Sequence, residues 1–166
     1  MDGTQGFRET DTAARWAGFT AWLATRLAEL PVACVIDAGR ADASMETHGY
    51  DVECAQMQRL HGGRILLRLS TTLMVIPLLD TYDGDVMEAD RWHHDDLFED
   101  CTHGYLVSSS PALVADLVTG WFRERCGFAE PDQIGFAYMS AKSLPRTADA
   151  GGADTAWARA AVADDE

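Results

Sequence analysis

Basic residues are scarce in this chain, which carries 13 Lys and Arg against 27 Asp and Glu and a formal net charge of −14. Nucleic-acid binding draws most of its affinity from cations that neutralise phosphates. A chain this acidic repels DNA, RNA and anionic lipid over about 8 Å in physiological salt. The composition therefore predicts no direct binding to nucleic acid or to a membrane surface, and it suits either a basic protein partner or simple solubility.

Long apolar runs and cysteine motifs are also missing. The longest apolar run, residues 73–79, is much shorter than the roughly 20 residues that span a bilayer. The acidic start Met1-Asp2-Gly3 does not resemble a secretory signal. The cysteines are widely spaced without a CxxC motif, at Cys34, Cys54, Cys101 and Cys126. We therefore expect reduced thiols in a cytosolic protein.

Hydrophobic spacing predicts an amphipathic helix near the start of the chain. Helix-starting residues occur at 10–12, and Pro31 ends the helix because the residue before a proline is pushed out of the α region. Apolar side chains between these limits recur at three- and four-residue steps, at Trp16, Phe19, Leu23, Leu27 and Leu30. The short apolar run at 32–36 then predicts a buried strand.

A β-hairpin is predicted in the middle of the chain, after a polar loop over 39–48. Residues 50–60 and 64–70 alternate between apolar and polar side chains, and the two glycines between them supply the positive φ of a tight turn. A further strand is predicted over 73–79, where a proline favours an edge position.

Clear signals also mark the elements after residue 100. Residues 104–107 suit a short strand, Ser110 suits the N-cap of a helix with Pro111 in its first turn, and Gly127 suits the residue after its end. Residues 133–139 predict a last strand.

The order of these elements predicts a single α+β domain over residues 10–146. We expect an antiparallel meander of about four to six strands with two main helices packed on one face. Residues 1–9 and 147–166 are predicted to be flexible termini, because they contain little to bury.

The segment 80–100 interrupts this pattern with nine acidic residues and one basic residue. Charge of one sign steers a partner of opposite charge, and aromatic side chains anchor it. We therefore predict a partner-binding surface formed by Tyr82, Asp83, Asp85, Glu88, Asp90, Trp92, Asp95, Asp96 and Phe98. The alternative is a solubilising loop whose aromatic side chains pack onto the domain.

Candidate chemistry is limited to one histidine cluster. His93, His94 and His103 lie among carboxylates and are conceivable ligands of a divalent metal, or members of an enzyme site. Adjacent histidines point in different directions in any regular element, and the chain has no HExxH motif, nucleophile elbow or phosphate loop. We therefore expect no catalysis, no metal and no cofactor, with an enzyme or metal-binding protein as an alternative.

Two parts of the chain resemble a known family. The first is a Trp-led helix (WAGFTAWLATRLAEL), an apolar strand (VACVID), and the strands VECAQMQRL and RILLRLSTTLMV on either side of the glycines. The second is the helix and its exit, LVADLVTGWFRERCGFAEPDQIGFA. Both resemble the actinobacterial peptide-binding chaperone domains related to type III secretion chaperones and YbjN-like proteins. The resemblance implies a compact α+β module, often a homodimer, that holds a segment of another protein.

These observations lead to two hypotheses about function. The first is a chaperone- or adaptor-like module that holds a segment of a secreted or partner protein in the cytosol, in a groove or at a sheet edge. The second is an immunity protein that neutralises a cognate toxin domain, with the acidic segment facing a basic cleft.

Overall fold

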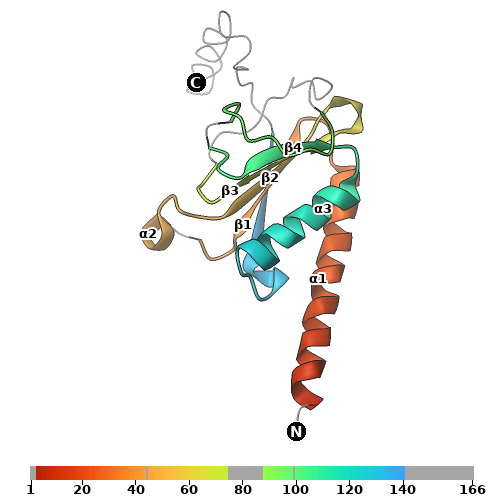
Figure 1. Ribbon diagram of the computed structural model, residues 1–166, viewed down its shortest axis with the longest axis vertical. Coiled ribbons are helices and arrows are strands. Elements are labelled where there is room, and N and C mark those ends of the chain that lie inside the picture. The colour runs from red at the N-terminus through yellow and green to blue at the C-terminus, as the bar shows by residue number, and fades with distance from the viewer. Residues whose placement is uncertain (1–2, 44, 75–87, 99, 141–166) are drawn as a thin grey trace, which may run out of the picture.

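The computed structural model describes residues 3–43, 45–74, 88–98 and 100–140, which form a two-layer α+β fold (Figure 1). A five-stranded antiparallel sheet has the strand order β4-β3-β2-β1-β5, and helices α1 and α3 lie side by side on one of its faces. The predicted fold class is therefore confirmed. The elements are α1 (Gly3–Glu29), β1 (Cys34–Arg40), α2 (Met45–His48), β2 (Cys54–Arg59), β3 (Ile65–Ser70), β4 (Gly104–Ser108), α3 (Pro111–Gly120) and β5 (Ile134–Ser140).

Helix α1 is longer than predicted, since it begins at Gly3 and includes most of the stretch 1–9 that was expected to be a flexible terminus. Adding a residue to an existing helix costs far less than nucleating one, and no proline interrupts residues 3–9. Its first turns extend past the rest of the molecule (Figure 1). The predicted apolar stripe packs into the core through Trp16, Leu23, Leu27 and Leu30.

The hairpin between β2 and β3 is confirmed. Its turn, His61–Gly63, contains Gly62 at φ 76° and Gly63 at φ 78°, backbone conformations that side chains with a Cβ rarely adopt. Strand β1 runs past the predicted end at residue 36 into the expected polar loop, because it is paired on both sides, with β2 and with β5. The cysteines are all free thiols in the structure.

The predicted start and end of the second helix are also confirmed. The Ser110 hydroxyl accepts a hydrogen bond from the N–H of Leu113 at 3.2 Å, and Gly127 has φ 72°. Sequence reasoning missed a π-helical turn, Trp121–Arg125, that continues α3.

The sheet face away from the helices is buried along β3, which differs from the predicted alternation of buried and polar positions. Arg68 and Ser70 lie on this face and are as inaccessible as Leu67 on the helix face. The reason is that residues 97, 98 and 101 pack over β3 and β4, on the face opposite the helices. Most of the strand predicted at 73–79, and the predicted tail 147–166, lie outside the described residues.

Among the described helices, none combines the length and the apolar composition that crossing a membrane requires.

Removing the N-cap of α3 tests the local origin of this helix. We expect Ser110→Ala to lower the free energy of unfolding by about 1 kcal/mol, because an N–H in the first turn loses its acceptor. Urea unfolding measures the difference. The neighbouring substitution Ser109→Ala is the control and is expected to change stability by less than about 0.5 kcal/mol. Equal effects of the two substitutions would show that the cap does not stabilise the helix.

Candidate protein-binding surface

A row of directly paired residues crosses all five strands on the face away from the helices. It consists of Ala137, Asp37, Gln56, Arg68 and Tyr105, on β5, β1, β2, β3 and β4 respectively. Opposite residues of an antiparallel sheet point to the same side, so these side chains form one line. Four of the five are polar, which is unusual because three of these, Gln56, Arg68 and Tyr105, are buried.

Arg68 is the centre of this row, with only 1% of its surface exposed. Its guanidinium donates hydrogen bonds to Asp100 Oδ1 at 2.6 Å and to Gln56 Oε1 at 2.6 Å. It also lies over the ring of Phe98, 4.7 Å from the ring centroid. Burial lowers the pKa of Arg68, and the carboxylate of Asp100 opposes that effect. Asp100 and Phe98 thus attach the end of the acidic segment to the centre of the sheet.

The described part of the acidic segment is closely bound to the domain. Asp95 accepts a hydrogen bond from the hydroxyl of Tyr105 at 2.7 Å. Phe98, which is 7% exposed, packs edge-on against the ring of Tyr105. Trp92 is half-buried against the main core. Two of the three aromatic side chains predicted to anchor a partner, Trp92 and Phe98, therefore pack onto the domain itself, as in the alternative of a solubilising loop.

Four acidic side chains of this segment are exposed to solvent. Glu88, Asp90, Asp95 and Asp96 are exposed, and Glu88 forms an ion pair with Arg91 at 2.6 Å. Their contact with a partner stays a prediction. The other predicted contacts, Tyr82, Asp83 and Asp85, lie outside the described residues.

The outer edge of β4 is covered by the same segment. His93 and Tyr105 exchange backbone hydrogen bonds of 2.9 and 3.0 Å, and the N–H of Asp90 donates to the carbonyl of Val107 at 2.8 Å. Asp90 adopts φ 58° at this point. One edge of the sheet is therefore closed by irregular backbone, which is a common protection against unwanted pairing.

Among the described strands, none lies on the outer side of β5. The N–H of Ala41 donates to the carbonyl of Gln133 at 2.8 Å, in register with the β1–β5 ladder. Because hydrogen-bonded pairs alternate in an antiparallel ladder, the backbone groups of Phe136 and Tyr138 point away from β1. Among the described residues, nothing pairs with them.

Aromatic side chains surround this open edge. Phe136 packs against Phe19 and Trp22 of α1, with ring centroids 5.9 and 5.2 Å apart. Trp22 remains 41% exposed and Tyr138 54% exposed. A pocket of about 510 Å³ continues the surface beyond Tyr138, and it is lined by Arg26, Glu29, Leu30, Pro31, Cys34, Tyr138 and Met139. We call β5 with Trp22 and this pocket the β5 surface.

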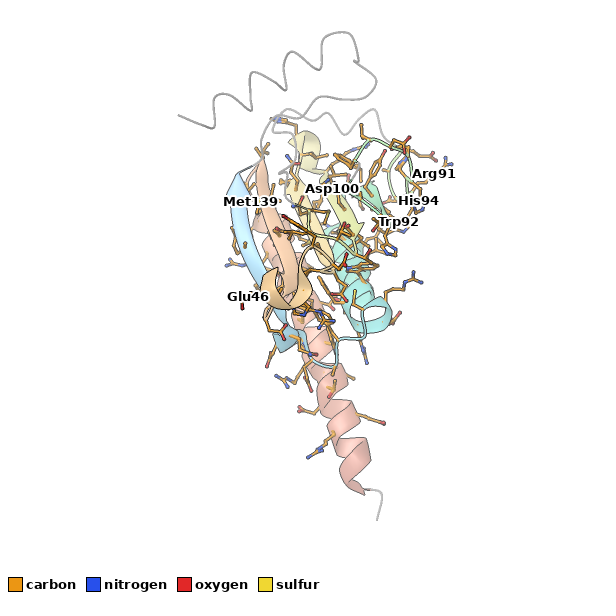
Figure 2. The ribbon with its side chains drawn as sticks, turned by 90° about the vertical axis from the view of Figure 1, so that its left-hand side faces the viewer. Glu46, Arg91, Trp92, His94, Asp100 and Met139 are labelled. Atoms are coloured by element: carbon orange, nitrogen blue, oxygen red, sulfur yellow. The ribbon has the colours of Figure 1, made fainter. Side chains whose placement is uncertain are left out.

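Two ion pairs hold α1 in place beside β5. Arg15 binds Glu130 at 2.8 Å and Asp132 at 2.6 Å, both in the turn that precedes the strand. The indole N–H of Trp16 donates to the carbonyl of Ala129 at 3.2 Å. Figure 2 shows Met139 of β5 at one side of the molecule and Arg91, Trp92 and His94 at the other. The β5 surface is therefore separate from the acidic segment.

The three histidines of the predicted cluster make different contacts, although His94 lies beside Gly104 and close enough to His103 to lower its pKa. His93 stacks on Tyr105 at 5.1 Å, whereas His103 contacts Trp121 at 4.5 Å, beside a second pocket of about 370 Å³. Within the described ranges, no three His, Cys, Asp or Glu side chains converge as metal ligands. Burial lowers the pKa of His103 and raises the pKa of Cys126, in the same pocket, to about 12, so this thiol is protonated at neutral pH.

Comparison with known proteins gives no relative for this chain: no family model, curated protein or solved structure matches it. The resemblance to peptide-binding chaperone domains therefore stays a prediction.

Breaking the ion pair of Arg68 is expected to be far more costly than breaking an exposed one. Asp100→Ala leaves a buried guanidinium without its carboxylate, and we expect a loss of about 3 kcal/mol in the free energy of unfolding. The control is Glu88→Ala, which breaks the exposed pair with Arg91 and is expected to cost less than about 0.5 kcal/mol. Chemical denaturation compares the two, and similar losses would contradict the central role of Arg68.

Asp37 predicts a pH dependence of stability. Burial raises its pKa to about 6, although the charge of Arg68 and a hydrogen bond with Gln56 act in the opposite direction. The folded state therefore binds this proton more tightly than the unfolded state, whose Asp pKa is about 3.9. The contribution of Asp37 to stability is most favourable below about pH 4 and falls as the pH rises through 6.

The substitution Asp37→Asn removes this penalty. We expect the variant to be more stable than the wild type at pH 7.5 and to lose that advantage at pH 4, as measured by urea unfolding at both pH values. The same stability difference at both pH values would show that Asp37 ionises normally.

Proposed function

We propose that this protein is a non-catalytic protein-binding module that takes up an extended segment of a partner protein as an additional strand beside β5. The observation that carries the proposal is the contrast between the two sheet edges. The backbone of β4 is covered by residues 88–93, whereas the outward N–H and C=O groups of Phe136 and Tyr138 have no partner among the described residues. Strand addition uses such groups for affinity.

The composition of β5 supports this proposal. Edge strands are usually protected by charges, prolines, bulges or short length, because an unprotected edge pairs with other chains. Strand β5 has seven residues, Ile134–Ser140, and contains neither a charge nor a proline. It also lies beside an exposed tryptophan, and aromatic residues are common energetic centres of protein interfaces. An edge of this kind suits a binding site.

The net charge favours another protein over a second copy of this chain as the occupant. Two copies, each with a formal charge of −14, repel each other, whereas a basic partner is attracted and its association is accelerated. This corresponds to a chaperone- or adaptor-like role in which a segment of a secreted or partner protein is held in the cytosol. A homodimer through β5 is the competing occupant.

An immunity protein is the second candidate. The supporting observation is that Glu88, Asp90, Asp95 and Asp96 are exposed on a segment that Arg68 and Tyr105 fix to the sheet. Carboxylates held in place in this way suit a basic toxin cleft, because little ordering remains to be done on binding. This candidate uses the acidic segment and leaves β5 free.

A proline in β5 tests strand addition directly. Proline lacks an N–H, and at residue 138 it removes an outward donor while the ladder to β1 keeps its hydrogen bonds. The partner is isolated from an extract of the host with the tagged protein and is then purified. We expect Tyr138→Pro to raise its Kd at least about tenfold in titration calorimetry. The control Tyr138→Thr loses the ring but keeps the N–H, and is expected to bind more tightly than the proline variant.

Two results would contradict this function. The first is unchanged partner binding by Tyr138→Pro together with loss of binding when Glu88, Asp90 and Asp96 are replaced by Lys, which favours the immunity protein. The second is a wild-type dimer in light scattering that Tyr138→Pro converts to a monomer, which assigns the edge to a second copy.

A further inference from the structure

The row of paired residues from Tyr105 to Ala137 reaches the edge of the sheet at β5. Its last two members are Asp37 on β1 and Ala137 on β5, which are directly paired. Ala137 is exposed, so its methyl group leaves the space above it accessible on this face. Asp37 is half-buried, and its carboxylate lies one strand in from the β5 edge.

Among the described residues, no cation is paired directly with Asp37. Its neighbours in the row are Ala137 and the amide of Gln56, whereas Arg68, one strand further away, is bonded to Asp100 and Gln56. Burial raises the pKa of Asp37 to about 6 and outweighs the opposite effects of the Arg68 charge and the Gln56 hydrogen bond. A cation placed next to Asp37 would compensate this carboxylate, which is ionised at neutral pH.

A strand added beside β5 extends the row by one position. Neighbouring strands are about 4.8 Å apart, so the added residue opposite Ala137 lies roughly 10 Å from Asp37. A side chain of lysine or arginine is long enough to cross the small Ala137 and reach the carboxylate. Any larger residue at 137 would obstruct that path.

The residues on either side of this position meet a different surface. Their side chains point to the helix face, opposite Phe136 and Tyr138, because successive residues of a strand alternate between faces. There they contact the exposed ring of Trp22 and the pocket beyond Tyr138, which includes Leu30, Pro31 and Cys34. Apolar side chains suit both places.

We infer that the segment bound at β5 has an apolar–cationic–apolar pattern, in which the lysine or arginine lies over Ala137 and pairs with Asp37. This inference rests on the proposed function and adds a rule of recognition to it. Asp37 is then a specificity-determining residue, and a partner of positive charge is selected at one defined position of the strand.

The test is a set of four affinities at pH 7.5. The probes are two short labelled peptides with the same threonine-rich flanks, one with Val-Lys-Val at its centre and one with norleucine, the uncharged analogue of lysine, in the same place. Each is titrated into the wild type and into Asp37→Asn, and circular dichroism verifies that the variant is folded. We expect Asp37→Asn to weaken the lysine peptide about fivefold and the norleucine peptide less than about twofold.

A second variant tests the same pairing by changing the residue next to Asp37. Ala137→Lys places a cation of the chain itself beside Asp37 and covers the path, so it is expected to abolish the preference for the lysine peptide. Equal weakening of both peptides by Asp37→Asn, or a lysine preference that survives Ala137→Lys, would overturn the inference.

The peptide titrations also distinguish an error in the pairing with Asp37 from an error in the proposed strand addition. If Tyr138→Pro abolishes the binding of both peptides while Asp37→Asn weakens them equally, strand addition stands and only the pairing with Asp37 is wrong. If neither peptide binds the wild type at millimolar concentration, or Tyr138→Pro binds both unchanged, strand addition is contradicted and the inference fails with it.

Discussion

The guanidinium of Arg68 determines how the second face of the sheet is built. A buried cation of this kind requires a carboxylate and further acceptors, and it receives them from Asp100 and Gln56. Asp100 comes from the acidic segment, so compensating the charge also brings that segment onto the sheet. Phe98 then packs on the guanidinium, and its neighbours close the edge of β4. One arginine in the centre of a strand thus accounts both for the residues that cover β3 and β4 and for the protected edge of β4.

The opposite edge of the sheet has no such cover among the described residues. The segment that protects β4 is attached above β3 and β4, and the uncharged strand β5 lies at the far side of the sheet. The helix layer adds to this asymmetry, because Arg15 and Trp16 fix α1 beside β5 and hold Trp22 at its margin. The β5 surface and the acidic segment therefore differ in chemistry as well as in position.

Local patterns in the sequence predicted most of the elements, although not the short helix α2 or the π-helical turn after α3, and they did not predict the surfaces. Ser110, Gly127 and the glycines at 62 and 63 act on their immediate neighbours, so their roles could be deduced from short stretches. The alternation of side chains in β3 correctly predicted that Arg68 and Leu67 lie on opposite faces of the sheet. It could not show that the face of Arg68 is covered, because the covering residues lie about 30 positions further along the chain.

The open edge was equally hidden from sequence analysis. Whether a strand lies at an edge depends on the order of strands in the sheet, and no short pattern records that β5 pairs with β1. The aromatic residues of the acidic segment posed a related problem. Trp92 and Phe98 looked like anchors for a partner, but side chains of this type also pack inward, and only the fold decides between the two.

The strand order also has a consequence for biosynthesis. Strands β1 to β4 follow one another along the sheet, whereas β5 returns from the end of the described chain to pair with β1, so Cys34 meets Ser140. Contacts of such long sequence separation form late, and during translation they wait until the last strand has left the ribosome. Until then β1 is itself an exposed edge. A segment that matches β5 in pattern can occupy that place, and nascent chains of this protein are therefore most vulnerable to mispairing before β5 emerges.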